Sequence, residues 1–283
     1  MEIKSLGKID FDTVFEAFQA AFADYEMQVD RTQLQVMLKR RGFNPNLSFA
    51  AFDEDRIVAF TLNGIGNFNG LSTAYDTGTG TLKEYRGQGL ATRVFEYSIP
   101  CLKQHKIDQY LLEVLQHNTG AVSVYRNLGF EPTREFNYFR QQNAAIDIEP
   151  KNSSASFVVR EIAIPDTNLV SGFWDFTPSW QNGFESIGRT AGDFVSLGAF
   201  AGDKLVGYSV FEPVSGDVTQ IAVDKENRRR GIASLLLGEM VRLNRNENLK
   251  VLNTDVTYRS MTGFLQAKNI ELKGRQFEMI RKI

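Results

Sequence analysis

The spacing of apolar residues along the first 140 positions alternates between helical and strand periods. A helix is predicted by four phenylalanines at spacings of four, three and four residues, which place four rings on one face for core packing: Phe11, Phe15, Phe18 and Phe22. A second amphipathic run follows Asp30 and stops near Gly42. The apolar segments 47–52 and 57–62 flank an acidic turn, which predicts a β-hairpin.

The next segments repeat this change of period. Residues 75–82 predict a strand weakened by glycines unless another backbone or a ligand lies close to it. A helix is expected from about Leu90, kinked or ended by Pro100. A short strand over 110–115 and a helix over 121–128 follow, and Gly129 is a suitable helix stop.

The second half of the chain repeats the first. A polar segment, 142–156, separates the halves, and Arg228 in the second copy follows Arg86 in the first by 142 residues. A repeat of this length is a duplicated domain, because solenoid units span only about 20–50 residues. We therefore predict an N-terminal domain over 1–145, a linker over 146–156 and a C-terminal domain over 157–283.

Composition restricts the class of protein. The 283 residues are 42% hydrophobic and 23% charged with a net charge of −2, values of a globular chain without a basic surface for nucleic acid. Cys101 is the only cysteine, and His105 and His117 stand apart, so we expect neither a disulfide nor a metal site. The N-terminus lacks a signal-peptide pattern and no apolar run is long enough for a membrane span, which predicts a cytoplasmic protein.

A glycine-containing turn between a strand and a helix occurs once in each half, and both copies fit R-x-x-G-x-A. Small residues let main-chain N–H groups approach a phosphate, and the helix N-terminus and basic side chains stabilise its charge. Neither copy has the Gly-Lys-Ser/Thr of a P-loop or the G-x-G-x-x-G of a Rossmann fold. The two turns consist of Arg86, Gly87, Gln88, Gly89, Leu90 and Ala91 in the first half, and of Arg228, Arg229, Arg230, Gly231, Ile232 and Ala233 in the second.

With this turn, the chain resembles the GCN5-related N-acetyltransferases (GNAT) in tandem form. The stretch 111–132 is similar to the catalytic segment of ribosomal-protein alanine N-acetyltransferases in six matching positions: Glu113, Asn118, Ala121, Tyr125, Gly129 and Phe130. The resemblance implies an α/β fold of two GNAT-like domains, each with a mixed, mostly antiparallel sheet flanked by helices and a splayed parallel strand pair. It also implies acetyl-CoA as acyl donor, with the pyrophosphate on the turn and the pantetheine along the preceding strand at Thr79, Thr81, Ile221 and Val223.

Acyl transfer to an amine requires that a protonated amine lose a proton before it attacks the thioester. By resemblance Glu113 is the candidate base, with Asp76 as an alternative, and Tyr125 is the candidate acid that protonates the departing thiolate. Asn118 is expected to cap the helix that carries Tyr125 and to contact the pantetheine. Main-chain N–H groups of 77–82 are expected to stabilise the oxyanion. A route through an acetyl-cysteine at Cys101 is not favoured, because no partner is evident to activate it.

The second half keeps the turn and loses the catalytic pattern. At an offset of 140 residues, Glu113, Asn118 and Tyr125 are replaced by the residues Asn253, Tyr258 and Leu265. Asp255 or Tyr258 could take over only by a shift of register. The aromatic stretch 173–184 contains Trp174 and Trp180, and is interpreted either as a core cluster or as a wall of the acceptor site.

The acceptor is not identified by the sequence. Tyr25, Glu26 and the predicted loop 64–74 are where specificity would be read. We expect an acyltransferase acting on a small-molecule or peptide amine, without nucleic acid or membrane partners, and leave a homodimer open. Three hypotheses remain: a small-molecule N-acetyltransferase, a protein N-terminal or lysine acetyltransferase, and a catalytically silent acyl-CoA sensor.

Overall fold

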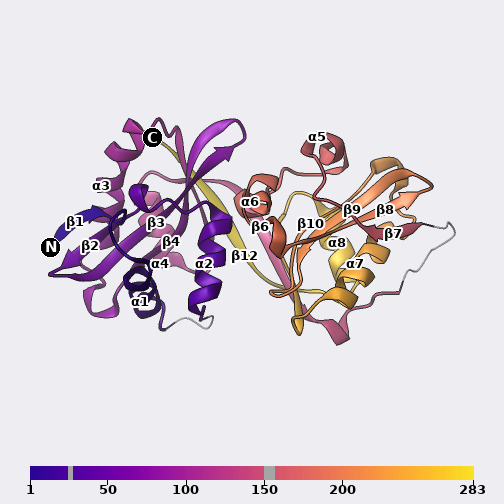
Figure 1. The fold of residues 1–283 in the computed structure, drawn as a ribbon, viewed down its shortest axis with the longest axis horizontal. Coiled ribbons are helices and arrows are strands. Elements are labelled where there is room, and N and C mark those ends of the chain that lie inside the picture. The colour runs from indigo at the N-terminus through magenta and orange to yellow at the C-terminus, as the bar shows by residue number, and fades with distance from the viewer. Residues whose placement is uncertain (25–27, 150–156) are drawn as a thin grey trace. The chain divides into compact units, whose positions relative to one another are not determined.

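The computed structural model describes residues 1–24, 28–149 and 157–283, and the chain forms two compact units. The first unit comprises Met1–Thr133 and Phe277–Ile283, and the second comprises Arg134–Gln276. The units therefore differ from the predicted ranges 1–145 and 157–283. Residues 134–145 belong to the second unit and residues 277–283 belong to the first, and we call this difference the exchange of strands. Figure 1 shows the yellow end of the chain among the indigo and purple elements of the first unit.

The first unit is built on a mixed sheet. Its strands are β1 (Glu2–Ser5), β2 (Phe49–Asp53), β3 (Arg56–Phe68), β4 (Leu71–Thr81) and β5 (Gln109–Leu115), followed in the sheet by the end of β12 (Glu271–Lys282). The pairs from β1 to β4 are antiparallel, whereas β4 and β5 are parallel. The prediction of a loop over 64–74 is wrong, because these residues are mostly the paired ends of β3 and β4. Only Asn69 and Gly70 stand between the strands, with φ of 54° and 83°, and they supply the left-handed turn that a tight hairpin requires.

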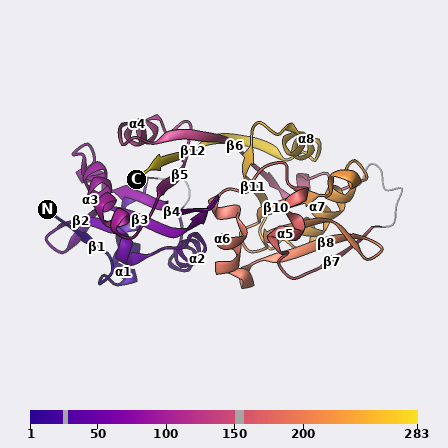
Figure 2. The ribbon, with the colours of Figure 1, turned by 90° about the horizontal axis from the view of Figure 1, so that it is seen from above.

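Four α-helices flank this sheet: α1 (Phe11–Ala21), α2 (Arg31–Arg41), α3 (Leu90–Gln104) and α4 (Thr119–Asn127). The four predicted phenylalanines lie on or just after α1 and pack against the core, which confirms that role. Asp30 caps α2 in a capping box, and Gly42 ends it with φ of 81°. Figure 2 shows α1 and α2 on one side of the strands and α4 on the other.

Pro100 does not end α3, contrary to one of the two outcomes expected for it. The helix continues to Gln104. Leu102 is fully buried and Ile99 nearly so, so core packing holds the last turn although proline removes one helical hydrogen bond. Cys101 packs, partly buried, against the core of this unit.

The second unit repeats the arrangement. Its sheet has the order β6 (Glu131–Gln142), β11 (Asn248–Asp255), β10 (Asp217–Val223), β9 (Lys204–Glu212), β8 (Val195–Ala201) and β7 (Val158–Glu161). Its helices are α5 (Thr167–Val170), α6 (Phe184–Arg189), α7 (Ile232–Leu243) and α8 (Arg259–Ala267). No helix within the described ranges has the length and apolar character needed to cross a membrane.

In both units two parallel strands separate at a β-bulge. Pairing of β4 with β5 covers Thr73 to Tyr75, and pairing of β10 with β11 covers Asp217 and Val218. The extra residue of the bulge is Thr77 in β4 and Thr219 in β10, again 142 residues apart. A bulge locally bends a strand and increases its twist, so each unit has a splayed edge beside its glycine-containing turn.

Candidate functional site

The turn before α3 has the geometry of an anion site. Gly87 and Gly89 have φ of 77° and 70°, and a side chain at either position would meet no atom within 4 Å. Gly89 is the N-cap of α3 and provides no side-chain hydrogen bond to the first turn. The turn therefore leaves open space beside the positive end of the helix.

The second turn keeps this backbone with different side chains. Gly231 is the N-cap of α7 with φ of 86°. Arg229 replaces Gly87 and still has φ of 62°, a left-handed conformation that costs a non-glycine residue roughly 1 kcal/mol or more. The backbone shape of the turn is therefore repeated in both copies although the residue at this position differs.

The first arginine of each motif holds the turn in place. Arg86 donates to the carbonyl oxygens of Thr81 at 3.2 Å and Ala21 at 2.9 Å, and to Oδ2 of Asp24 at 3.2 Å. These bonds connect the turn with the end of α1 and the end of β4. Arg86 was predicted to contact the phosphate. Its side chain also braces the turn, a structural role that the sequence motif did not reveal.

Arg228 makes the same set of bonds in the second unit. It donates to the carbonyl oxygens of Val223 at 3.2 Å and Phe173 at 2.9 Å, and to Oδ1 of Asp175 at 2.8 Å. Burial would raise the pKa of Asp175, but the hydrogen bonds from Ser260 and Arg228 outweigh it and the pKa is lowered. The recurrence in both units shows that this bracing belongs to the duplicated domain.

A cavity of about 350 Å³ lies between β4, α3 and α4 in the first unit. Its lining comes from the ends of elements that the sequence analysis expects to surround the acyl donor. Of the predicted site residues it brings together Thr79, Thr81, Arg86, Ala91, Asn118 and Tyr125. Glu113, Gly87, Gln88, Gly89 and Leu90 lie outside this lining. The Asn118 side chain accepts from the Ala121 N–H at 3.2 Å, which confirms it as the helix cap.

Tyr125 is paired with a carboxylate that lies on β4. Its hydroxyl donates to Oδ2 of Asp76 at 3.0 Å. Thr79 Oγ1 and the Gly78 N–H also donate to Asp76, each at 2.9 Å. Burial raises the pKa of Asp76, although these three hydrogen bonds and the charge of Arg41 act in the opposite direction. The arrangement places a phenol and a carboxylate in direct contact at the splayed edge.

Glu113 is positioned one strand away, on β5. Its Oε2 accepts from the Tyr75 hydroxyl at 3.3 Å. Burial and the neighbouring Glu113 charge raise the pKa of Tyr75 well above its ordinary value, so this phenol remains protonated. Sequence reasoning missed Tyr75 and also Arg41, whose Nη1 donates to the Thr77 carbonyl oxygen at 3.1 Å. Neither stands in a motif, and only the register of β4 against β5 and the end of α2 bring them to the site.

The candidate catalytic positions of the first unit have different residues in the second. Val218 corresponds to Asp76 and is buried, and Leu265 corresponds to Tyr125 and belongs to the core. Asn253 corresponds to Glu113, is buried with φ of 59°, and donates to Ser179 Oγ at 2.7 Å. Asp255 accepts from Thr257, and Tyr258 lies with its ring 5.8 Å from that of Phe176.

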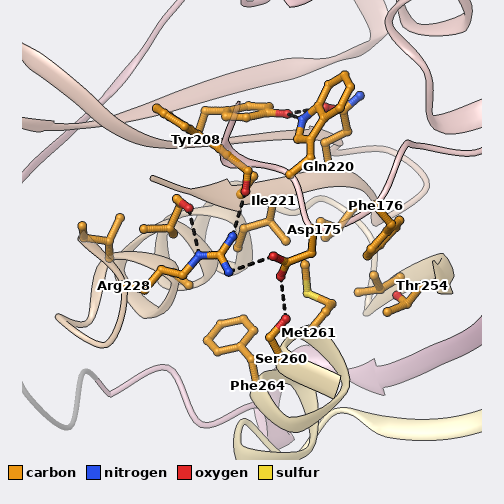
Figure 3. Close-up of a pocket in the computed structure, with 18 of the residues that line it drawn as sticks. Asp175, Phe176, Tyr208, Gln220, Ile221, Arg228, Thr254, Ser260, Met261 and Phe264 are labelled. Atoms are coloured by element: carbon orange, nitrogen blue, oxygen red, sulfur yellow. Dashed lines mark hydrogen bonds and ion pairs between the residues drawn. The ribbon is translucent and has the colours of Figure 1, made fainter. Parts of the chain in front are cut away.

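The second unit contains a larger cavity, of about 550 Å³, next to its turn. Figure 3 shows Asp175 between Arg228 and Ser260, with Phe176 and Thr254 at the opposite end. Trp174 lines this cavity and donates to the Tyr208 hydroxyl at 2.6 Å, whereas Trp180 is buried. The aromatic stretch therefore contributes both to a cavity wall and to a core. Tyr25 and Glu26 lie outside the described residues.

Comparisons with known proteins agree with this geometry. N-alpha-acetyltransferase 30 of Schizosaccharomyces pombe is 33% identical over 87 residues, 30% of this chain and 58% of that protein. A tandem GNAT protein from the clavulanic acid biosynthesis pathway has a similar fold, with a TM-score of 0.72 at 15% identity over 99% of this chain and 98% of that one. A glucosamine N-acetyltransferase region of a fungal multi-domain β-N-acetylglucosaminidase gives a TM-score of 0.74 at 12% identity, over 99% of this chain and 38% of that one.

The curated relative is matched over little more than half of its length, and the two structures share the fold with this chain. The family comparison extends further, since the profile of the acetyltransferase (GNAT) family matches residues 11–130 and 158–266. These two segments make up most of the chain and coincide with the two copies of the strand, turn and helix described above. The protein therefore belongs to the GNAT acetyltransferase family and contains two copies of its domain.

Proposed function

We propose that the first unit transfers an acetyl group from acetyl-CoA to a primary amine, by direct attack of the amine on the thioester in a ternary complex. One observation carries this proposal: Tyr125 lines the cavity beside the glycine-containing turn, and its hydroxyl donates to the partly buried carboxylate of Asp76 at 3.0 Å. The second unit has Leu265 and Val218 at these positions. We therefore assign the chemistry to the first unit alone.

The turn and the splayed edge fit the donor substrate. The open space above Gly87 and Gly89 allows main-chain N–H groups at the start of α3 to approach a pyrophosphate. Beyond Tyr75 the edge of β4 no longer pairs with β5, so its peptide groups can pair with the amides of a pantetheine arm. Thr79 and Thr81 line the cavity along this edge. Acetyl-CoA would supply the activated acetyl group as a thioester.

The proton transfers of the reaction can be linked through the contact between Tyr125 and Asp76. A carboxylate accepts one proton from the amine as the new C–N bond forms, and the Tyr125 hydroxyl gives one proton to the sulfur as the C–S bond breaks. Since Tyr125 donates to Asp76, a protonated Asp76 can return its proton to the tyrosine oxygen. Starting from the neutral amine, the net result moves one proton from nitrogen to sulfur and restores both side chains. The proton that an ammonium group loses before the attack leaves to solvent.

The choice of base can be tested by two substitutions. If Asp76 is the base, Asp76→Asn lowers kcat by a factor on the order of 10²–10⁴, and Glu113→Gln has the smaller effect. Because burial raises the pKa of Asp76 above 3.8, and a base acts when deprotonated, the acidic limb of kcat should lie at higher pH than for an exposed aspartate. The measurement is the pH profile of kcat at saturating amine for the wild type and for both variants. A larger loss in Glu113→Gln would assign the base to Glu113.

Donor binding provides a separate prediction. Isoleucine at Gly89 would force a β-branched side chain into φ of 70° and direct it into the space above the turn, so Gly89→Ile should weaken acetyl-CoA binding by at least about tenfold. Isothermal titration measures the affinity. Gly231→Ile makes the matched change in the second unit and should leave thiol release intact, whereas equal loss of activity in both variants would place the reaction elsewhere.

The activity itself is tested by thiol release from acetyl-CoA with a broad panel of amines. Mass spectrometry of treated peptides then separates a small-molecule enzyme from a protein-modifying one. The identity of 33% to an N-alpha-acetyltransferase segment makes a peptide N-terminus the second candidate acceptor. Binding of acetyl-CoA without thiol release above the uncatalysed rate, for every amine and peptide, would favour a catalytically silent acyl-CoA sensor instead.

A further inference from the structure

The bulge of β4 places one peptide group of the candidate site outside the regular strand ladder. Pairing of β3 with β4 shifts its register between Leu62 and Asn63, and Thr77 is the extra residue on β4. Thr77 is 3% exposed, and its hydroxyl donates to the Leu62 carbonyl oxygen at 2.8 Å. A bulge residue is left out of the ladder, and a buried main-chain carbonyl group requires a donor from elsewhere.

Arg41 provides this donor. Its Nη1 donates to the Thr77 carbonyl oxygen at 3.1 Å, and the residue is partly buried. The N–H of the same peptide group belongs to Gly78 and donates to Oδ1 of Asp76 at 2.9 Å. The peptide group between Thr77 and Gly78 is therefore held at both ends, by a cation at its oxygen and by a carboxylate at its nitrogen.

We infer that Arg41 is a positioning residue of the acetyl-transfer site, which holds this peptide group so that its N–H stays on Oδ1 of Asp76 while Oδ2 stays on Tyr125. The inference rests on the proposed function, because it gives the Asp76–Tyr125 pair a further support. Arginine keeps its charge in proteins, so Arg41 loses no proton in the reaction. It acts on Asp76 through one peptide group.

The backbone of Arg41 is fixed beside β3. Arg41 is the last residue of α2, and Gly42 follows it in the left-handed conformation. The Ile65 N–H donates to the Gly42 carbonyl oxygen at 2.9 Å, and Phe43 forms a β-bridge with Gly64. A Cβ atom at Gly64 would lie 2.0 Å from the Arg41 carbonyl oxygen, so this close approach requires glycine. The end of α2 is thus docked on the strand that pairs with β4, within reach of the bulge.

The arginine at the end of the equivalent helix has other partners in the second unit. Like α2, α6 ends in an arginine, Arg189. Arg189 donates to Glu185 Oε1 at 2.5 Å and to Ser186 Oγ at 3.3 Å, four and three residues earlier. In α2 the side chains three and four residues before Arg41 are apolar. The arginine thus has acceptors in its own helix in the unit that lacks the Asp76 carboxylate, and contacts the bulge in the unit that has it.

Arg41 also favours the charged form of the carboxyl group that it supports. The charged and titratable groups near this carboxyl come from four elements and are Arg41 on α2, Tyr125 on α4, Tyr75 on β4, and Tyr110 and Glu113 on β5. Burial raises the pKa of Asp76, whereas its hydrogen bonds and the positive charge of Arg41 lower it. Removing that charge should therefore raise the pKa of Asp76 further.

The test compares Arg41→Gln with Arg41→Lys in the full chain. Glutamine keeps an N–H donor and removes the charge, whereas lysine keeps the charge. Arg41→Gln should lower kcat at neutral pH by a factor on the order of 10–100. It should also move the acidic limb of the kcat profile to higher pH, because the base acts when deprotonated and its pKa rises. Arg41→Lys should restore most of both properties, and the affinity for acetyl-CoA in isothermal titration should change little in either variant.

Lys39→Gln is the matched control, because it removes one positive charge from the same turn of α2 at an exposed position. Its kcat and acidic limb should equal those of the wild type. Carbon NMR titration of the Asp76 carboxyl signal, identified by its loss in Asp76→Asn, measures the pKa without turnover. That pKa should be higher in Arg41→Gln than in the wild type and in Lys39→Gln.

An unchanged pKa of Asp76 together with an unchanged acidic limb in Arg41→Gln would overturn the inference. Equal loss of kcat in Arg41→Gln and Arg41→Lys, with no movement of the limb, would also overturn it and would assign Arg41 a structural role only. The NMR titration decides the inference even where the wild type releases no thiol with any amine, an outcome that would reject the proposed function alone.

Discussion

Replacing Tyr125 by phenylalanine is expected to lower kcat by a factor on the order of 10²–10⁴ while leaving the affinity for acetyl-CoA little changed. The substitution removes only the hydroxyl that donates to Asp76 at 3.0 Å. The ring remains packed 5.7 Å from Phe130 in the core, so the fold of α4 should persist. Thiol release measures kcat, and isothermal titration measures donor binding.

Tyr97→Phe is the matched control, since this tyrosine is on α3 of the same unit and is 47% exposed. Its kcat should equal that of the wild type. Combining Tyr125→Phe with Asp76→Asn tests whether the two groups act as a pair, because the losses of a coupled pair are not additive. Wild-type kcat in Tyr125→Phe would rule out the tyrosine as the acid.

The duplicated domain and its turn were predictable because they depend on short-range sequence signals. Glycines at 87, 89 and 231 and the helices after them recur at a fixed offset, and the required left-handed φ values select glycine locally. The helix cap Asn118 follows from the same kind of signal. The hydrophobic periods also placed the four helices of the first unit to within a few residues, whereas β3 and β4 extend past the predicted strands 57–62 and 75–82.

The pairing of side chains at the site was harder to predict, because it depends on register. The sequence favoured Glu113 over Asp76 as the candidate base, and did not predict which side chain contacts Tyr125. The structure has Asp76, beside the bulge at Thr77, in contact with Tyr125, and Glu113 in contact with Tyr75. A shift of one residue in a strand exchanges its faces. No pattern in one sequence fixes that shift.

The sequence pattern also did not predict the exchange of strands between the two units. Residues 134–142 pair with β11 of the second unit, and residues 277–283 complete the first. The two strands occupy equivalent places in the repeat and present similar alternations of apolar and polar residues. Main-chain hydrogen bonds do not distinguish between them, so only the packing of particular side chains selects the sheet in which each one lies.

Met279 makes this exchange testable, because it is fully buried in the core cluster that also contains Tyr110, Val122 and Phe130. Met279→Ala should lower the free energy of unfolding of the first unit by about 2–5 kcal/mol, through lost burial and a cavity. Since Tyr125 packs against the same cluster, kcat should also fall. Hydrogen exchange of the β5 amides and thermal unfolding measure the change in stability.

Leu272→Ala provides the control for this prediction. Leu272 lies on the same strand, β12, but belongs to the second unit and is 40% exposed, so its truncation should leave the exchange rates of β5 and kcat nearly unchanged. Faster hydrogen exchange in the second unit alone after Met279→Ala would show that β12 stabilises the second unit, the repeat to which it belongs in the sequence. Faster exchange of β5 would show instead that the candidate active site depends on residues more than 150 positions after Tyr125 in the chain.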